Sequence, residues 1–342
     1  MFQGKSVVGL DIGNSAVKAI ELTKSGQSYR VTGYAQIDFP SGEMEAKISA
    51  VSQLMKEAGF RSKKVSTNIS GKTVIIRYLN MVAMDDGELR NAIRFEAEKF
   101  VPVSLDECVL DCQRLEGIDG DSPSESNVVL VAAEKSLLNQ QIAIVQKAGY
   151  TPEVIDVDAF AIGNAYKLFV EQAGDIDGSS LGAMAFVDVG ATKTTVNIMV
   201  SSCPVFTREI YLGGADMTAS IARQLGLDEP HAEALKRCPG DKFEEVQNAV
   251  FPTLDDLGNE LQLSFDYFEG QNNASIERVF VSGGASRMSF FCESLSKICE
   301  KPVEVFNPFT GIQVDDDIDQ ELLVSAGTQF VVAVGLAARM GQ

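Results

Sequence analysis

The chain of 342 residues has no tryptophan, a single histidine, His231, and six cysteines without any Cys-x-x-Cys pair. A zinc site needs clustered cysteine and histidine ligands, and these residues are scattered, so a zinc-binding domain is excluded. We expect free thiols, as in proteins of a reducing cytosol. The cysteines are Cys108, Cys112, Cys203, Cys238, Cys292 and Cys299.

Long hydrophobic runs are also lacking. No stretch of about 18 uncharged apolar residues, the length of a membrane-spanning helix, occurs in the sequence. The longest apolar segment, residues 330–338, is half that length and contains Gly335, which is typical of a buried helix. Residues 1–5 lead into a strand pattern without the charged-then-apolar arrangement of a signal peptide. We therefore expect a cytoplasmic protein without direct membrane insertion.

Positive charge is scarce, since 29 lysines and arginines face 48 aspartates and glutamates, for a formal net charge of −19. Such a surface repels the phosphates of nucleic acids and of anionic lipids, so binding to either is disfavoured. The remaining composition, 45% hydrophobic and 23% charged, is that of a globular protein long enough for two domains.

Two common nucleotide-binding fingerprints are missing. No Gly-x-Gly-x-x-Gly occurs, so nothing marks a dinucleotide-binding fold. The stretch Ser70-Gly71-Lys72-Thr73 resembles only the end of a P-loop, because Ser66 stands where the first glycine of that loop belongs. Residues 74–78 then have the pattern of a strand and not of the helix that a P-loop needs, so we reject this motif.

Hydrophobic periodicity predicts alternating strands and helices. Strands are predicted at residues 6–12, 17–22, 29–37, 64–69, 73–81, 107–115, 128–133, 153–156, 183–188, 194–200, 205–211, 278–281 and 303–306. Helices are predicted at 44–58, 85–101, 215–225, 231–237, 242–269, 287–299 and 323–339. A further helix is predicted to follow the strand at 153–156 and to end at about residue 170. The polar segment 116–127 is interpreted as an exposed loop, and the Gly-, Asp- and Ser-rich stretch 174–180 as a domain boundary.

One motif occurs twice. Residues 9–20 are Gly-Leu-Asp-Ile-Gly-Asn-Ser-Ala-Val-Lys-Ala-Ile, and residues 186–197 are Phe-Val-Asp-Val-Gly-Ala-Thr-Lys-Thr-Thr-Val-Asn. Each has an apolar strand, then Asp, an apolar residue, Gly, a small or amide residue, and Ser or Thr before a second strand. Each copy opens one half of the chain, which indicates two similar domains that face each other.

The residues of these hairpins suit a polyphosphate. Glycine allows a sharp turn, and the backbone N–H groups and hydroxyls can then approach an anion. Asp11 and Asp188 are oxygen ligands suited to Mg²⁺ through water, and Lys18 could reach a terminal phosphate. One such hairpin is usually an ordinary turn, but two at matched positions favour a phosphate clamp. The candidate turn residues are Gly13, Asn14, Ser15, Gly190, Ala191 and Thr192.

Two glycine pairs, Gly213-Gly214 and Gly283-Gly284, each follow a strand and precede a helix. This layout places backbone N–H groups at a helix N-terminus, where they bind anions and nucleotides. Tight strand-to-helix turns are the alternative for either pair alone. Lys193, close to the turn of the second hairpin, and Arg287, close to Gly283-Gly284, are candidate nucleotide contacts or plain surface charges.

These motifs resemble, in order, the phosphate-1, phosphate-2 and adenosine motifs of the actin–Hsp70–sugar kinase superfamily. The likeness extends to two connecting helices, at 155–161 and 331–337, and to Glu233 and Lys236, which match the family's residues beside the ribose and adenine. It covers nearly the whole chain and implies an α/β, actin-like (ribonuclease H-like) two-domain ATPase fold that binds ATP and Mg²⁺. Asp158 matches the acid or amide that orients the attacking water in related ATPases, with a helix N-cap as the alternative.

The resemblance also divides the chain. Residues 1–172 are expected to form the first actin-like domain, with an FtsA-like α+β subdomain inserted at about 78–151. Residues 181–342 are expected to form the second, and the connector helix at about 323–339 to pack back toward the first.

Within the superfamily, four stretches resemble the PilM family of type IV pilus assembly proteins. They are residues 9–18, 154–161, 208–214 and 305–309. The resemblance implies a protein that binds the N-terminal cytoplasmic peptide of a PilN-type inner-membrane protein, with the inserted subdomain as the expected site. It also implies pilus motor components as partners and a peripheral place at the inner membrane through those partners, and leaves self-association open.

Two other functions share this fold. FtsA-like filament-forming ATPases carry a C-terminal amphipathic membrane helix after a linker, whereas this sequence ends at Gln342, just after the connector-like helix. A small-molecule kinase would need a substrate base in the cleft and is usually longer. Because the acid at position 158 is Asp and not the longer Glu, we expect a slow ATPase at most.

Overall fold

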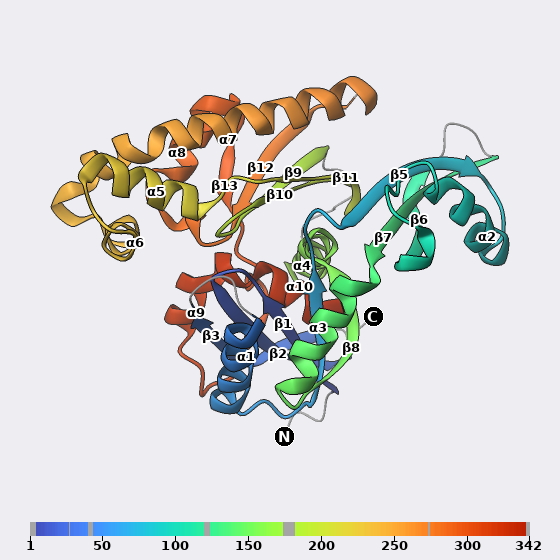
Figure 1. The fold of residues 1–342 in the computed structure, drawn as a ribbon, viewed down its shortest axis with the longest axis horizontal. Helices are drawn as coiled ribbons and strands as arrows, with labels where there is room; N and C mark the ends of the chain where they lie inside the picture. Colours follow the sequence, from blue (N-terminus) through green and yellow to red (C-terminus); the bar gives the residue numbers. More distant parts are fainter. Residues whose placement is uncertain are drawn as a thin grey trace.

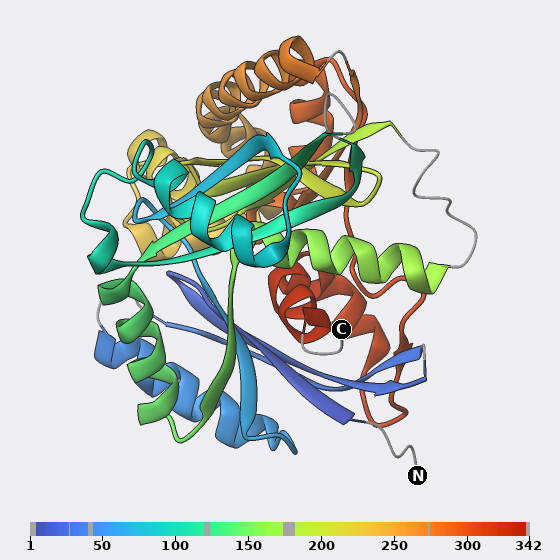
Figure 2. The ribbon, with the colours of Figure 1, turned by 90° about the vertical axis from the view of Figure 1, so that its right-hand side faces the viewer.

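The computed structural model describes residues 5–26, 28–39, 44–119, 124–173, 182–272 and 274–339. Its architecture consists of two large sheets stacked about a central helical layer and a smaller sheet that projects to one side (Figure 1). The view turned by 90° places the small sheet and its helix in front of the larger sheets (Figure 2). The predicted boundary at 174–180 lies outside the described residues.

The first large sheet has six strands in the order β14-β3-β2-β1-β4-β8. Its strands are β1 (Lys5–Ile12), β2 (Ala16–Ser25), β3 (Ser28–Asp38), β4 (Lys64–Ile69), β8 (Thr151–Val157) and β14 (Gln313–Val314). The strands β1, β2 and β3 are antiparallel, whereas β4 and β8 run parallel to β1. β1 is buried along most of its length, so its near-continuous apolar pattern matches its central place.

The second large sheet repeats this topology with five strands in the order β11-β10-β9-β12-β13. They are β9 (Ala183–Val189), β10 (Thr194–Val200), β11 (Cys203–Ile210), β12 (Ile276–Ser282) and β13 (Val303–Val305). Again three antiparallel strands precede two parallel ones. The two copies of the sequence motif therefore form the first hairpins, β1–β2 and β9–β10, of two sheets with the same topology.

Two connecting helices lie between the sheets, α4 (Asp158–Ala173) and α10 (Val331–Arg339) (Figure 1). They belong to one hydrophobic core that also contains Ile20 of β2 and Phe186 of β9. The helices cross so closely that a Cβ atom at Gly335 would lie 1.7 Å from the carbonyl oxygen of Ala161. Small residues therefore set the spacing of this central layer.

The segment Gln320–Arg339 has the length and the mean hydropathy, 1.6, of a membrane-crossing helix. However, 67% of its apolar window is buried inside the protein. The segment comprises α9 (Gln320–Ala326), a short 3₁₀ turn and α10, where a single continuous helix was predicted. Its hydrophobicity is explained by the central layer, where α10 packs on α4 and β1.

The small sheet has the order β5-β7-β6, with β5 (Val74–Val82), β6 (Cys108–Asp119) and β7 (Glu125–Glu134). Helix α2 (Asp86–Ala97) covers it through Leu89 and Ile93, and Asp85 caps this helix in a capping box with Glu88. The loop predicted at 116–127 is wrong at both ends, because β6 and β7 extend into it and pair as far as Asp119 and Ser126. Residues 120–123 of that prediction lie outside the described residues. The polar composition of this segment led to the loop prediction, although its ends pair as antiparallel strands.

Helix α3 (Lys135–Lys147) has no counterpart among the predicted helices. It lies within the span expected for the inserted subdomain, but its Ile144 and Val145 pack against α1 (Met44–Ala58) on the six-stranded sheet. The small sheet itself begins at Val74 and ends at Glu134. The other helices are α5 (Gly214–Leu225), α6 (Glu229–Arg237), α7 (Phe243–Asn272) and α8 (Phe291–Cys299).

Candidate functional site

A cavity of about 1000 Å³ lies where the two large sheets face each other. It is lined by the turns of the β1–β2 and β9–β10 hairpins, by α5 and α6, and by the turn after β12. Most nucleotide-site candidates from the sequence line this cavity. They are Asp11, Asn14, Ser15, Lys18, Asp188, Gly190, Ala191, Thr192, Gly214, Glu233, Lys236, Gly283, Gly284 and Arg287. The candidates Gly13, Asp158, Lys193 and Gly213 do not line it.

The two hairpin turns have matching backbone geometry. The Gly13 N–H donates to the carbonyl of Ala16 at 3.0 Å, and the Gly190 N–H donates to the carbonyl of Lys193 at 2.9 Å. A Cβ atom at Gly13 would lie 2.9 Å from that acceptor, and one at Gly190 would lie 3.0 Å from its own. The glycines therefore keep both turns tight, as the repeated motif requires.

Two carboxylates on the strands that enter these turns face the cavity. Asp11 is 6% exposed and accepts hydrogen bonds from Lys18 Nζ and Asn68 Nδ2, each at 3.0 Å. Asp188 accepts one from Ser282 Oγ at 2.7 Å, and burial raises the pKa of Asp188 to about 6. Burial also acts to lower the pKa of Lys18, but the nearby Asp11 and Asp188 carboxylates outweigh it and raise this pKa. Lys18 is therefore a fixed cation among the carboxylates.

The opposite wall of the cavity holds an ion pair on α6. Lys236, 9% exposed, contacts Glu233 Oε2 at 2.6 Å, Thr218 Oγ1 at 2.7 Å and the carbonyl of Gly214 at 2.8 Å. Burial lowers the pKa of Lys236. Burial acts to raise the pKa of Glu233, but the hydrogen bonds from Lys236 and Thr218 outweigh it, and this pKa falls to about 2. Glu233 is thus ionised at neutral pH and fixed in place.

The glycine pairs bring two turns against the second hairpin. Gly283 has φ +87°, which favours glycine, and a Cβ atom there would lie 2.3 Å from the carbonyl oxygen of Val189. A Cβ atom at Gly213 would lie 2.7 Å from the carbonyl oxygens of both Gly190 and Ala191. Gly213 therefore shapes the cavity by allowing α5 to approach, although it does not line the wall.

Two polar contacts join the halves across the cavity. Asn14 Nδ2 donates to Thr192 Oγ1 at 2.7 Å, and Arg237 Nη1 lies 2.9 Å from Asp38 Oδ2. Arg237 also contacts Glu233 Oε1 at 2.8 Å. Asp38 and Arg237 line the cavity but were not among the sequence candidates. No local sequence pattern indicates these two residues, because their contact joins positions 199 residues apart.

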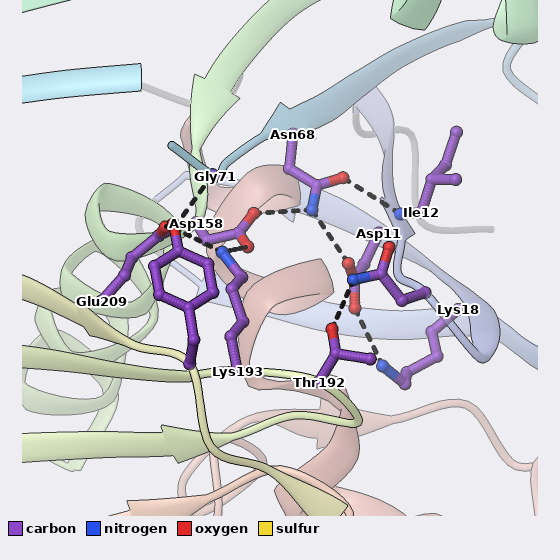
Figure 3. A network of polar contacts seen from close by, with 11 residues as sticks. Asp11, Ile12, Lys18, Asn68, Gly71, Asp158, Thr192, Lys193 and Glu209 are labelled. Atoms are coloured by element: carbon purple, nitrogen blue, oxygen red, sulfur yellow. Dashed lines mark hydrogen bonds and ion pairs between the residues drawn. The ribbon is translucent and has the colours of Figure 1, made fainter. Parts of the chain in front are cut away.

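Asp158 and Lys193 belong to a polar network beside the cavity (Figure 3). Asp158, the first residue of α4, accepts a hydrogen bond from Asn68 Nδ2 at 2.7 Å and contacts Lys193 Nζ at 3.1 Å. Lys193 Nζ also contacts Glu209 Oε1 at 2.5 Å. Burial acts to lower the pKa of Lys193, but Asp158 and Glu209 outweigh it and raise this pKa. Lys193 thus faces two carboxylates and not the cavity.

The sequence analysis missed Asn68 and Glu209. Asn68, on β4, is 5% exposed; its amide donates to Asp11 and Asp158 and accepts from the Ile12 N–H at 3.0 Å. A polar residue inside a buried parallel strand needs partners, so its position was a usable signal. The position of Glu209 offered no such signal, because polar residues are common in strands at the edge of a sheet.

A second cavity, of about 250 Å³, lies between β5 and β11, which are edge strands of their sheets. Its wall includes Val74 and Ile76 from β5 and Thr207 and Glu209 from β11. Tyr78 and Thr207 link the two strands by a hydrogen bond of 2.9 Å. Since each edge strand pairs on one side only within the described chain, backbone groups remain available along this junction.

Comparison with known proteins places the chain in a family. The family model of type IV pilus assembly protein PilM matches residues 9–341. The solved PilM–PilN type IV pilus biogenesis complex is similar with a TM-score of 0.85 and 29% identity, over 98% of this chain and 98% of that chain. Cell division protein FtsA of Bacillus subtilis (strain 168) is 24% identical over 327 residues, 87% of this chain and 67% of its own length.

Ethanolamine utilization protein EutJ from Carboxydothermus hydrogenoformans shares the fold, with a TM-score of 0.59 and 14% identity over 98% of this chain and 89% of that chain. These likenesses agree with the paired sheets of equal topology, and the predicted actin-like α/β fold is confirmed. Because the family model spans nearly the whole sequence, the chain belongs to the type IV pilus assembly protein PilM family.

Proposed function

We propose that this protein is an ATP-binding actin-like component of the type IV pilus assembly machinery that binds the N-terminal cytoplasmic peptide of a PilN-type inner-membrane protein. The likeness to the PilM–PilN complex over 98% of both chains carries this proposal. The protein would work in the cytoplasm, peripheral at the inner membrane through its partners, and link pilus motor components to the envelope complex.

ATP and Mg²⁺ are the proposed ligands of the large cavity, whose size suits a nucleotide. Lys18 supplies positive charge for phosphates, and Glu233 and Lys236 supply fixed polar groups for the ribose and base. Asp11 and Asp188 would hold Mg²⁺ through water. The bound metal would neutralise phosphate charge.

Asp158 is the proposed positioning residue for slow hydrolysis. We expect Asp158→Asn to lower ATP turnover at least about tenfold, because Asp158 holds Asn68, which bonds to Asp11 at the cavity, and displaced positioning groups slow turnover. Its Mg·ATP affinity should stay within about threefold, because the side chain does not line the cavity. A coupled phosphate-release assay measures turnover, and titration calorimetry measures affinity.

Asp156→Asn is the matched control, since Asp156 lies two residues away on β8 and bonds to Asn164 at 3.2 Å, outside the network of Asp158. It should leave turnover unchanged. Normal turnover of the Asp158 variant would leave that residue only a structural role, through its contacts with Asn68 and Lys193.

The junction between β5 and β11 is the proposed place for the partner peptide. It lies beside the small sheet, but its lining residues fall outside the span 78–151 where the sequence analysis expects the partner site. A cavity between two strand edges suits an extended peptide, whose backbone can pair with an edge while side chains enter the cavity. Ile76 gives this cavity an apolar side chain at its β5 wall.

Ile76→Lys is expected to weaken binding of the PilN-type N-terminal peptide from the same genome at least about tenfold, because it puts a charge into an apolar contact. Fluorescence anisotropy of the labelled peptide measures the affinity. Val82→Lys, at the exposed end of the same strand, should bind like wild type. Equal affinity of the Ile76 variant, with wild type binding, would move the peptide site elsewhere.

A further inference from the structure

An unbroken series of side-chain contacts joins the two cavities (Figure 3). Asp11 lines the large cavity and bonds to Asn68, which bonds in turn to Asp158. Asp158 contacts Lys193 at 3.1 Å, and Lys193 contacts Glu209 at 2.5 Å. Glu209 lines the cavity between β5 and β11. Five side chains therefore span the distance from one cavity to the other.

The far end of this series holds the connection to the small sheet. Glu209 Oε1 accepts a hydrogen bond of 3.1 Å from the backbone N–H of Gly71. Gly71 has φ +107° and lies between β4 and β5, where the chain passes from the six-stranded sheet to the small sheet. The Val74 N–H then bonds to the Gly71 carbonyl at 2.9 Å, which starts β5. A change at Glu209 would therefore affect the connection between β4 and β5, which leads into the small sheet.

The near end of the series lies against the large cavity. Lys193 directly follows Thr192 in the turn of the second hairpin, and Thr192 lines that cavity. Asp11 and this turn lie on opposite sides of it. The side chains of Asp158, Lys193 and Glu209 are only 13%, 16% and 20% exposed, so their contacts are little screened by water.

We propose that the Asp158–Lys193–Glu209 contacts couple nucleotide bound in the large cavity to the geometry of the cavity between β5 and β11. Fixing the two hairpins fixes Lys193, which holds Glu209 and, through it, Gly71 and β5. By reciprocity, a ligand between β5 and β11 then alters nucleotide affinity by the same factor. This inference rests on the proposed function, since it requires nucleotide binding in the large cavity.

Hydrogen exchange of the full chain, with and without saturating Mg·ATP, tests the coupling. In wild type, the amides of residues 70–78 are expected to exchange about fivefold more slowly with Mg·ATP, the lower end of ordinary coupling factors. In Glu209→Gln, which removes the ion pair with Lys193, this protection should be lost. The segments 11–18 and 283–287, which contribute residues to the wall of the large cavity, should stay protected in that variant.

Tyr211→Phe is the matched control. It removes a hydrogen bond of 2.9 Å from Tyr211 to Glu209 Oε2 but leaves the contacts with Lys193 and Gly71, so protection of residues 70–78 should persist. If the cavity segments respond to Mg·ATP but residues 70–78 do not, or if Glu209→Gln behaves like wild type, the coupling proposal is overturned. If no segment responds in folded wild type, nucleotide binding itself fails. A second variant, Glu209→Ala, repeats the test if Glu209→Gln unfolds.

Discussion

Replacing Asp11 and Asp188 together with asparagine is expected to weaken Mg·ATP binding at least about 100-fold, since each charged contact contributes about 1.5–3 kcal/mol. The two carboxylates face one cavity from different sheets, and each belongs to a hairpin of the repeated motif. Asparagine keeps the shape of each side chain but lacks the charge that a hydrated Mg²⁺ needs. Titration calorimetry of Mg·ATP into both proteins measures the effect.

Circular dichroism should show that this double variant still folds, although less stably, because Asp11→Asn removes the ion-pair partner of Lys18. Burial disfavours the ionised form of Asp188, as its raised pKa of about 6 shows, so a neutral amide there is tolerated. The matched control is Asp255→Asn with Asp256→Asn, which removes the same charge from the exposed side of α7 and should bind Mg·ATP normally.

Equal binding by the Asp11 and Asp188 variant and by wild type would contradict the two-hairpin clamp. No binding by folded wild type would remove every nucleotide assignment in the cavity. The pilus role would then rest on the family match and on the likeness to the PilM–PilN complex. Repeating the titration without Mg²⁺ distinguishes a loss of affinity that depends on the metal from one caused by the loss of direct phosphate contacts.

The parts of the site that the sequence predicted all have local causes. A hairpin that needs glycine, a carboxylate at the end of a strand and a glycine pair before a helix are each visible within about six residues. Gly13 and Gly190 therefore match their predicted turns, and Asp11 and Asp188 their predicted strand ends. The repeat then indicated that the two hairpins face one cleft.

The parts that the sequence did not predict depend on distant contacts. Glu209 meets Lys193 only because the β10–β11 pairing places it beside the hairpin turn. Arg237 reaches Asp38 only once the two halves face each other. Similarly, α3 was missed because its apolar side chains find their partners on α1, nearly a hundred residues earlier in the chain. Periodicity cannot identify such partners.

Gly335→Ala is expected to destabilise the protein by at least about 3 kcal/mol, at the upper end of overpacking effects. The added Cβ atom would lie 1.7 Å from the carbonyl oxygen of Ala161, which is backbone of the neighbouring helix α4 and cannot rotate away. Helices α4 and α10 would have to separate, in a layer where β1 also packs closely, since a Cβ atom at Gly9 would lie 2.0 Å from the carbonyl oxygen of Ala333. Thermal unfolding should show a midpoint lowered by about 4 °C or more.

Gly270→Ala is the matched control, because Gly270 lies on the exposed surface of helix α7 and a Cβ atom there would meet nothing within 4 Å. That variant should be as stable as wild type or up to about 1 kcal/mol more stable, through helix propensity. Similar stability of both variants would mean that the central layer adapts and that its spacing is not set by glycine. If only the Gly335 variant loses stability, it should also show weaker nucleotide-linked protection of residues 70–78. Helix α4 begins at Asp158, so a shift of this helix moves the Asp158 carboxylate away from Lys193.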